Sequence, residues 1–238
     1  CKVSGLAAIR LSRPEVGAAV QFFKDFGLTV VSADQDLALL RGTSDLTPSV
    51  IVERGPAAYL GFSLMVDNAK DLHHLAAAHH AVVQANHPAI GGQCVALSDP
   101  DGLQVQIIHG WQPLAPLPAA TSIELNQPQH TPRINRTVRL DYSRPPAINK
   151  LGHTVLGVSR FADSLAWYQH NFGLIVSDFQ MMDDDDTPVV AFMRCDCGDT
   201  PTDHHTIAIG SAVETGHLHT AFELPDMDAV VAAGIVLK

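Results

Sequence analysis

Cysteine is scarce in this chain, and its four cysteines do not form a recognisable metal-binding set. Only Cys195 and Cys197 lie close together, in the segment RCDCGD. A structural zinc site needs four ligands, and no second cysteine pair completes one. A soft metal could bind this C-x-C pair, but two small interior side chains are the favoured interpretation. Few cysteines and thirteen histidines predict a reducing, cytoplasmic location.

Basic residues are also few. Fifteen Lys and Arg against 25 Asp and Glu give a formal net charge of −10 and a pI near 5.6. Without a Lys/Arg cluster to neutralise phosphates, a nucleic-acid partner is not expected. No apolar run reaches the ~18 residues of a membrane helix, and the N-terminal residues show no signal-peptide pattern. We therefore expect a globular protein that binds a small molecule.

Two parts of the chain follow the same plan. Residues 5–34 and 150–179 each read as an alternating strand, an amphipathic helix with paired aromatics, the tripeptide FGL, and a second strand. Gly27 and Gly173 of the FGL tripeptides should end their helices in the left-handed conformation. Ser159 or Asp163 is expected to cap the second helix.

The likeness continues in residues 58–78 and 217–234, each an alternating strand followed by an Ala-rich helix, and it pairs Phe62 with Phe222. The first copy then passes through the turn DPDG into a hairpin. We expect an α+β protein of two tandem modules, residues 1–110 and 151–238, joined by a proline-rich linker, 111–150. The second module is expected to lack its last hairpin within this sequence.

A tandem βαβββ unit with FGL after the helix and DPDG before the last strand resembles the vicinal oxygen chelate superfamily. That superfamily includes glyoxalase I, the bleomycin and fosfomycin resistance proteins, and the type I extradiol dioxygenases. The resemblance covers nearly the whole chain and implies two modules, each of paired βαβββ units. It also implies that His153 in LGHTVL and His219 in LHTAFE are metal ligands. The third ligand, a glutamate, would belong to the missing hairpin, so a chain that truly ends at Lys238 is expected to bind iron poorly and to be inactive.

The resemblance assigns Ala8, Tyr59 and Gln106 to the corresponding positions of the first module. Alanine and tyrosine cannot replace imidazole, so this module is expected to be metal-free, as in extradiol dioxygenases with an inactive N-terminal module. His205 in DHHTIAIG stands where such dioxygenases carry a catalytic histidine beside the metal. Glyoxalase I and the resistance proteins do not need that residue. Within the superfamily the chain is therefore most similar to a type I extradiol, or catechol 2,3-, dioxygenase.

The expected reaction is cleavage of a small aromatic diol by O₂ at a mononuclear Fe(II), with Mn(II) as the alternative metal. His205 would act as acid and base. Two alternatives stay open: a glyoxalase-like lyase or isomerase using zinc or nickel, and a metal-free binding protein of the resistance kind. The resemblance implies a homo-oligomer. Which catechol is cleaved is not readable from the sequence.

Strand alternation sorts the other candidate residues. His153, His205 and His219 are each expected on strands, and side chains two apart share a face, which groups His217, His219, Ala221 and Glu223. Glu223 lies about 13 Å along the strand from His219 and is expected at the surface. His217 is expected either to contact and orient the metal ligands or to be exposed to solvent. His204 should face away from His205, while the pairs His73-His74 and His79-His80 and the aspartate run 183–186 are expected in solvent.

Overall fold

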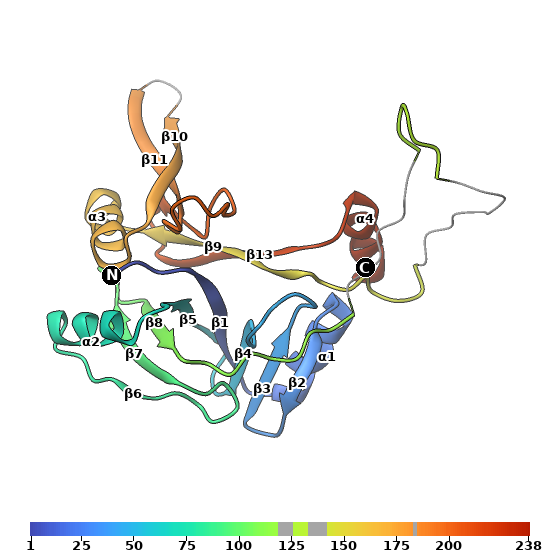
Figure 1. Cartoon of the computed structure of the whole chain (residues 1–238), viewed down its shortest axis with the longest axis horizontal. Coiled ribbons are helices and arrows are strands. Elements are labelled where there is room, and N and C mark those ends of the chain that lie inside the picture. Colours follow the sequence, from blue (N-terminus) through green and yellow to red (C-terminus); the bar gives the residue numbers. More distant parts are fainter. Residues whose placement is uncertain (119–125, 133–141, 183–184) are drawn as a thin grey trace.

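The computed structural model describes residues 1–118, 126–132, 142–182 and 185–238 (Figure 1). The first module forms an eight-stranded sheet in the order β2-β3-β4-β1-β5-β8-β7-β6. Its elements are β1 (Gly5–Arg13), α1 (Val16–Phe26), β2 (Thr29–Ala33), β3 (Leu37–Arg41), β4 (Val50–Arg54), β5 (Ala58–Met65), α2 (Ala69–Ala78), β6 (Gln84–Ala85), β7 (Gln93–Ser98) and β8 (Gln104–His109).

The second module forms a five-stranded sheet in the order β10-β11-β12-β9-β13. Its elements are β9 (Lys150–Val158), α3 (Phe161–Phe172), β10 (Ile175–Met182), β11 (Asp185–Arg194), β12 (Ile207–Ser211), β13 (Gly216–Glu223) and α4 (Met227–Val236). In both sheets the first strand pairs parallel with the fourth and antiparallel with the fifth. The second sheet therefore repeats the first five strands of the first sheet in the same order, with β13 in the place of β5, which confirms the expected α+β tandem-module fold.

The registers of the two sheets show which residues correspond. Ile9 is the first residue of β1 to pair with β4, and Thr154 is the first of β9 to pair with β12. Their amides bond equivalent carbonyls, Ile9 N to Ser49 O at 3.0 Å and Thr154 N to Thr206 O at 3.3 Å. Ala8 therefore corresponds to His153, as the sequence predicts.

Each helix ends at its FGL glycine, as predicted: Gly27 has φ 107° and Gly173 has φ 63°, both left-handed. The predicted cap of α3 is wrong. The N-cap residue of α3 is Arg160, and neither its side chain nor that of Asp163 makes a capping hydrogen bond. Ser159 instead donates its amide to Asp101 Oδ2 at 3.0 Å and its hydroxyl to Asp101 Oδ1. The helix is thus tied to the DPDG turn of the other module.

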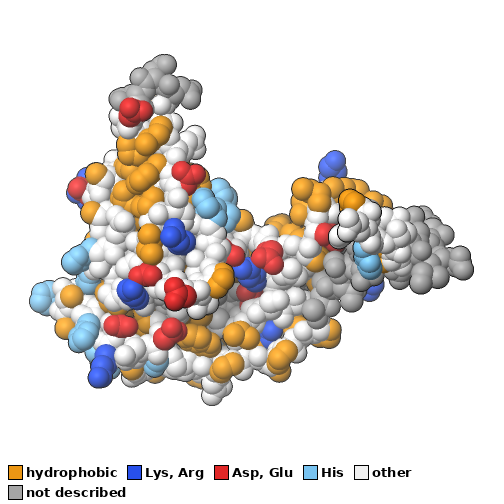
Figure 2. All heavy atoms as spheres, turned by 45° about the horizontal axis from the view of Figure 1, so that its top comes forward, with side chains coloured by type: hydrophobic (Ala, Val, Ile, Leu, Met, Phe, Trp, Pro, Cys, Tyr) orange, Lys and Arg blue, Asp and Glu red, His pale blue; other side chains and the backbone are white. Residues whose placement is uncertain are grey.

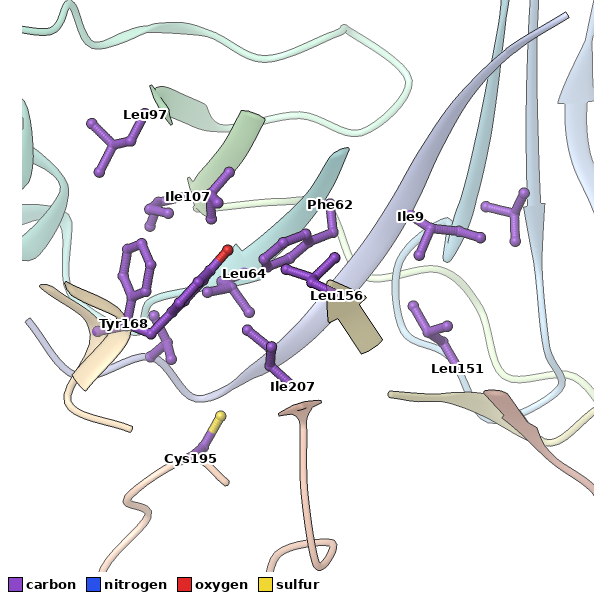
Figure 3. Close-up of a cluster of buried hydrophobic side chains, with 14 of the residues drawn as sticks. Ile9, Phe62, Leu64, Leu97, Ile107, Leu151, Leu156, Tyr168, Cys195 and Ile207 are labelled. Carbon is purple, nitrogen blue, oxygen red and sulfur yellow. The ribbon is translucent and has the colours of Figure 1, made fainter. Parts of the chain in front are cut away.

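One hydrophobic core runs through both modules. The helix-covered faces of the two sheets meet in the middle, where Phe62 and Leu64 of β5 lie near Leu156 of β9, Ile207 of β12 and Tyr168 of α3 (Figure 3). Tyr168 is fully buried and donates to Asp99 Oδ2 of the DPDG turn at 2.9 Å. The opposite face of each sheet therefore points away from this core.

The segment before the first strand of each module, β1 or β9, bonds the end of the first helix of the other module. Val3 N donates to Phe172 O at the end of α3, and Ile148 N donates to Gly27 O at the end of α1, both at 3.1 Å. His79 after α2 also joins this contact, because its Nε2 lies 2.6 Å from Asn171 Oδ1. The expectation that His79 lies in solvent is wrong, whereas His73, His74 and His80 are exposed.

Two parts of the second module carry exposed apolar side chains. The β10–β11 hairpin projects from the body, and Figure 2 shows apolar side chains along it. The large apolar side chains exposed on this hairpin are Ile175, Phe179, Met181 and Met182. On α4, Met227, Val230, Val231, Ile235 and Leu237 are exposed. Half of the aspartate run, residues 183 and 184, lies outside the described residues. None of the described helices has both the length and the apolar character required to span a membrane.

Candidate active site

Three histidines from three segments come together on the face of the second sheet that the helices do not cover. His153 lies on β9 opposite Ala221, and His219 lies on the neighbouring strand β13 opposite Val155. The ring centroids of His153 and His205 are 4.0 Å apart, and those of His153 and His219 are 5.6 Å apart. The structure thus assembles the three residues singled out from the sequence.

His205 does not lie on a strand, contrary to expectation. It lies in the loop just before β12, and its ring packs edge-on against Phe192 of β11 with centroids 5.1 Å apart. His204 is exposed, as expected, but it does not turn away from His205, because the Nδ1 atoms of the two residues are 3.1 Å apart. A loop frees neighbouring side chains from the alternation of a strand.

A β-bulge between His217 and His219 overturns the predicted grouping of the β13 side chains. His217 faces the core: its ring stacks on Tyr59 at 4.0 Å, and its Nε2 lies 2.8 Å from Thr220 Oγ1. His219 contacts His153 on the other face. A bulge inserts one residue into the alternation, so residues two apart can point to opposite faces.

Both His153 and His205 favour the neutral form. Burial, with the neighbouring imidazoles of His205 and His219, lowers the pKa of His153 from 6.5 to about 4. Burial and the nearby His204 and His219 also lower the pKa of His205. A neutral imidazole has a free lone pair, which is the form that binds a metal or accepts a proton.

A lysine and two carboxylates border the histidines. Lys150 Nζ lies 2.7 Å from Asp203 Oδ2 and 3.4 Å from Glu223 Oε2. A cavity of about 250 Å³ is lined by Gly152, His153, Asp203, His204, His205, Ala221, Phe222 and Glu223. Glu223 is exposed and pairs with Lys150 at the far end of β9 from Val155, so it lies at the rim of the site as expected. Asp203 was not singled out from the sequence, because its loop position gives no periodic signal.

The donor set for a metal is partial. Within residues 1–118, 126–132, 142–182 and 185–238, no group of three His, Cys, Asp or Glu side chains could hold a metal ion. His153 and His219 supply two imidazoles on adjacent strands, which suits a divalent transition metal that takes a further ligand. Burial raises the pKa of Cys195 to about 11, so its thiol stays protonated and is a poor metal ligand.

The first module cannot hold the same ligands. The residue that corresponds to His219 is Gly61 rather than Tyr59, because Gly61 lies opposite Arg10 just as His219 lies opposite Val155. A Cβ atom at Gly61 would lie 1.9 Å from Gln104 O, and its φ is +129°. Tyr59 corresponds instead to His217, the residue on which it stacks. The predicted pairing of Phe62 with Phe222 is likewise shifted by two residues, since Leu64 and Phe222 occupy equivalent registers.

Comparison with known proteins agrees with this architecture. Residues 150–237 match the family described as Glyoxalase/Bleomycin resistance protein/Dioxygenase superfamily. No curated protein matches the chain in sequence.

Solved structures cover almost the whole chain at low sequence identity. The 2,3-dioxygenase LapB from Pseudomonas sp. KL28 is 17% identical, with a TM-score of 0.76 over 99% of this chain and 80% of its own. Homoprotocatechuate 2,3-dioxygenase from Arthrobacter globiformis is 16% identical, with a TM-score of 0.73 over 98% and 67%. The Mn(II)-bound glyoxalase from Novosphingobium aromaticivorans is 19% identical, with a TM-score of 0.73 over 98% and 69%.

At these identities the likeness concerns the fold, and it holds across both modules. The family match covers the second module, which carries the three histidines. Residues 150–237 are therefore similar to the Glyoxalase/Bleomycin resistance protein/Dioxygenase superfamily, and along its whole length the chain shares the fold of these solved structures.

Proposed function

We propose that the protein is an extradiol dioxygenase that inserts both atoms of O₂ into a catechol-type diol at a mononuclear Fe(II). The observation that carries the proposal is the histidine cluster. His153 and His219 lie on adjacent strands as candidate ligands, and His205 packs 4.0 Å from His153 as a further imidazole beside them. A lyase of the glyoxalase kind or a metal-free binding protein has no need of that third histidine. Two of the similar structures are 2,3-dioxygenases.

In this proposal His153 and His219 hold the metal, together with a carboxylate that is not among the described residues. Imidazole nitrogen suits Fe(II), and Mn(II) takes the same donors. The bound ferrous ion would supply open coordination positions and electron transfer between diol and O₂. The lowered pKa of His153 keeps its lone pair free at neutral pH.

In this proposal His205 accepts and donates the proton of the reaction. Because burial lowers its pKa, the ring is neutral at pH 7 and can accept a proton from a diol hydroxyl, then return it later in the reaction. The contact of its Nδ1 with His204 Nδ1 fixes the ring plane, and Phe192 shields one edge from water. His205 is therefore the proposed catalytic acid and base, and His204 a positioning residue.

The setting of this activity is also a proposal. We place it in the cytoplasm, where the four free cysteines, Cys1, Cys94, Cys195 and Cys197, would stay reduced. We also expect the active form to be a homo-oligomer that acts on small aromatic diols.

A second candidate is a glyoxalase-like lyase or isomerase, which uses a divalent metal without a redox step. The similarity to a Mn(II)-bound glyoxalase supports it. In that case His205 would not be required, and no oxygen would be consumed.

The test is anaerobic reconstitution of the natural full-length protein with ferrous salt, followed by oxygen uptake and near-UV/visible spectra with a panel of catechols. The expected result is a yellow ring-opened product with one O₂ consumed per diol. His153→Ala and His219→Ala should lose both bound iron and activity. His73→Ala removes an exposed histidine of α2 and is the matched control, which should keep both.

Two results would contradict the proposal. One is ferrous iron bound at one per chain with no oxygen uptake for any catechol, which would favour the glyoxalase-like alternative. The other is full iron binding in His153→Ala, which would show that the metal does not bind at His153.

A further inference from the structure

The first module keeps a cavity on the sheet face that corresponds to the histidine site. This cavity of about 550 Å³ lies between the face opposite the helices and the segment that follows β6, and its lining includes Arg10, Leu39, Ile51, Asn86 and Gln106. Small-molecule pockets have volumes of ~300–1,000 Å³. On the same face, Ala8 and Gly61 stand at the positions that correspond to His153 and His219 and offer no ligating side chain, so we expect a ligand of this cavity to bind without a metal.

The floor of the cavity is apolar. Its lining residues Leu39, Ile51 and Ile90 form, together with Ala8 beneath them in the sheet, a buried cluster separate from the main core, and each is less than 7% exposed. Leu39 and Ile51 lie directly opposite one another on β3 and β4. Such a floor suits the flat face of a ring.

Three side chains at the cavity each accept a hydrogen bond from the protein, which fixes how they are oriented. Asn86 Oδ1 accepts from His87 N at 2.9 Å, His87 Nδ1 accepts from Ala89 N at 3.2 Å, and Gln106 Oε1 accepts from Ser63 Oγ at 2.9 Å. In this orientation the N–H groups of Asn86 Nδ2, His87 Nε2 and Gln106 Nε2 remain as donors. Asn86 Nδ2 is buried and has no hydrogen-bond partner among the described residues. An unpaired buried donor is costly, so an acceptor there would be favoured.

The charges at the cavity are balanced apart from these donors. Arg10 pairs with Glu53 at 2.7 Å and with Gln104 Oε1 at 2.6 Å, and Arg54 pairs with Asp36 at 3.1 Å. The two carboxylates are therefore already neutralised by the two guanidinium groups. The unpaired buried side-chain atom at this cavity is the donor Asn86 Nδ2, which favours an acceptor group on the ligand.

We propose that this cavity is a second, metal-free site that binds a small aromatic carboxylate. The ring would lie on the floor of Leu39, Ile51 and Ile90, and the carboxylate oxygens would accept from Asn86 Nδ2 and Gln106 Nε2. This site does not depend on the function proposed for the histidine cluster.

The test is isothermal titration of benzoate into the natural full-length protein, first treated with chelator so that no metal binds the probe. One benzoate per chain is expected, while benzylamine, with a similar ring and a cationic group, should bind at least tenfold more weakly. Asn86→Asp and Gln106→Glu keep the side-chain shape but replace a donor by an acceptor, and each should weaken benzoate binding at least tenfold. Gln180→Glu, the same change on exposed β10, is the matched control and should leave the affinity unchanged.

His153→Ala distinguishes this site from the histidine cluster, and benzoate binding should survive it. The proposal is overturned if benzoate does not bind at millimolar concentration, if Asn86→Asp and Gln106→Glu bind it as tightly as the unmodified protein, or if His153→Ala abolishes binding. Circular dichroism of each variant confirms that a loss of binding is not a loss of fold.

Discussion

In the proposed function, His205 is the residue that favours ring cleavage over a glyoxalase-like reaction. Its ring is held between His153, Phe192 and His204. His205→Asn keeps a polar side chain but removes the base, so we expect kcat to fall about 10²–10⁴-fold with iron content unchanged. Steady-state oxygen uptake and metal analysis of the same sample measure the two quantities. A variant that keeps kcat would remove His205 from the mechanism.

The same buried histidines should make the metal-free protein sensitive to acid. The pKa of His153 is about 4 in the folded chain, against an ordinary value of 6.5. Below pH 6.5 the unfolded chain therefore binds a proton that the folded chain resists. The stability that neutral His153 contributes is fully present above pH 6.5 and is lost as the pH falls toward 4.

Urea unfolding of chelator-treated protein between pH 7 and 4 measures this loss. His153→Gln should flatten the decline, because glutamine does not titrate, and His73→Gln on exposed α2 should not. Equal slopes for all three proteins would show that His153 is not the sensitive group.

At the scale of single elements, the N-terminal end of helix α3 is tied to the other module. Asp101 accepts both the amide and the hydroxyl of Ser159, so a carboxylate lies near the positive end of the helix. Asp101→Ala should lower the free energy of unfolding by about 0.5–1.5 kcal/mol, the usual net value of a hydrogen bond. Asp163→Ala is the control, because Asp163 pairs with exposed Arg160 in the same turn rather than with the other module. Urea denaturation measures both variants, and equal losses would contradict a stabilising contact between Asp101 and Ser159.

How far the sequence predicts an element depends on whether the pattern is local. The FGL glycines and the repeated strands follow from local patterns and are confirmed as features of the fold, whereas His153 and His219 were assigned as metal ligands from the family resemblance and stay a prediction. The bulge in β13 leaves no such mark, so alternation misplaced His217 and paired Tyr59 with His219. The bond between Asp101 and Ser159 was missed because the two residues are 58 positions apart in the chain.

At the scale of the whole molecule, the two modules share one core and a buried hydrogen bond. Tyr168 of α3 donates to Asp99, whose pKa is raised by burial. Tyr168→Phe removes the hydroxyl and leaves the buried Asp99 Oδ2 without this donor, so we expect the free energy of unfolding to fall by about 1–3 kcal/mol. Because the core is continuous, unfolding should remain a single transition in both proteins. Two separate transitions in the unmodified protein would show that the modules unfold independently.

This arrangement also explains why the two outward faces have diverged. The pseudo-equivalent residues Tyr59 and His217 stack on each other at the centre, so the modules are fixed back to back. Each outward face is then free to carry its own site. The second module places histidines there, and the first places Ala8, Gly61 and a set of hydrogen-bond donors.

The most direct test of the central proposal is the fate of labelled oxygen. The natural full-length protein, reconstituted with ferrous salt, is given a catechol under ¹⁸O₂, and the product is analysed by mass spectrometry. The proposal predicts a ring-opened product that carries both labelled atoms, formed by the unmodified protein and not by His153→Ala or His219→Ala. A product without label, or turnover of catechol that survives the loss of both histidines, would contradict it.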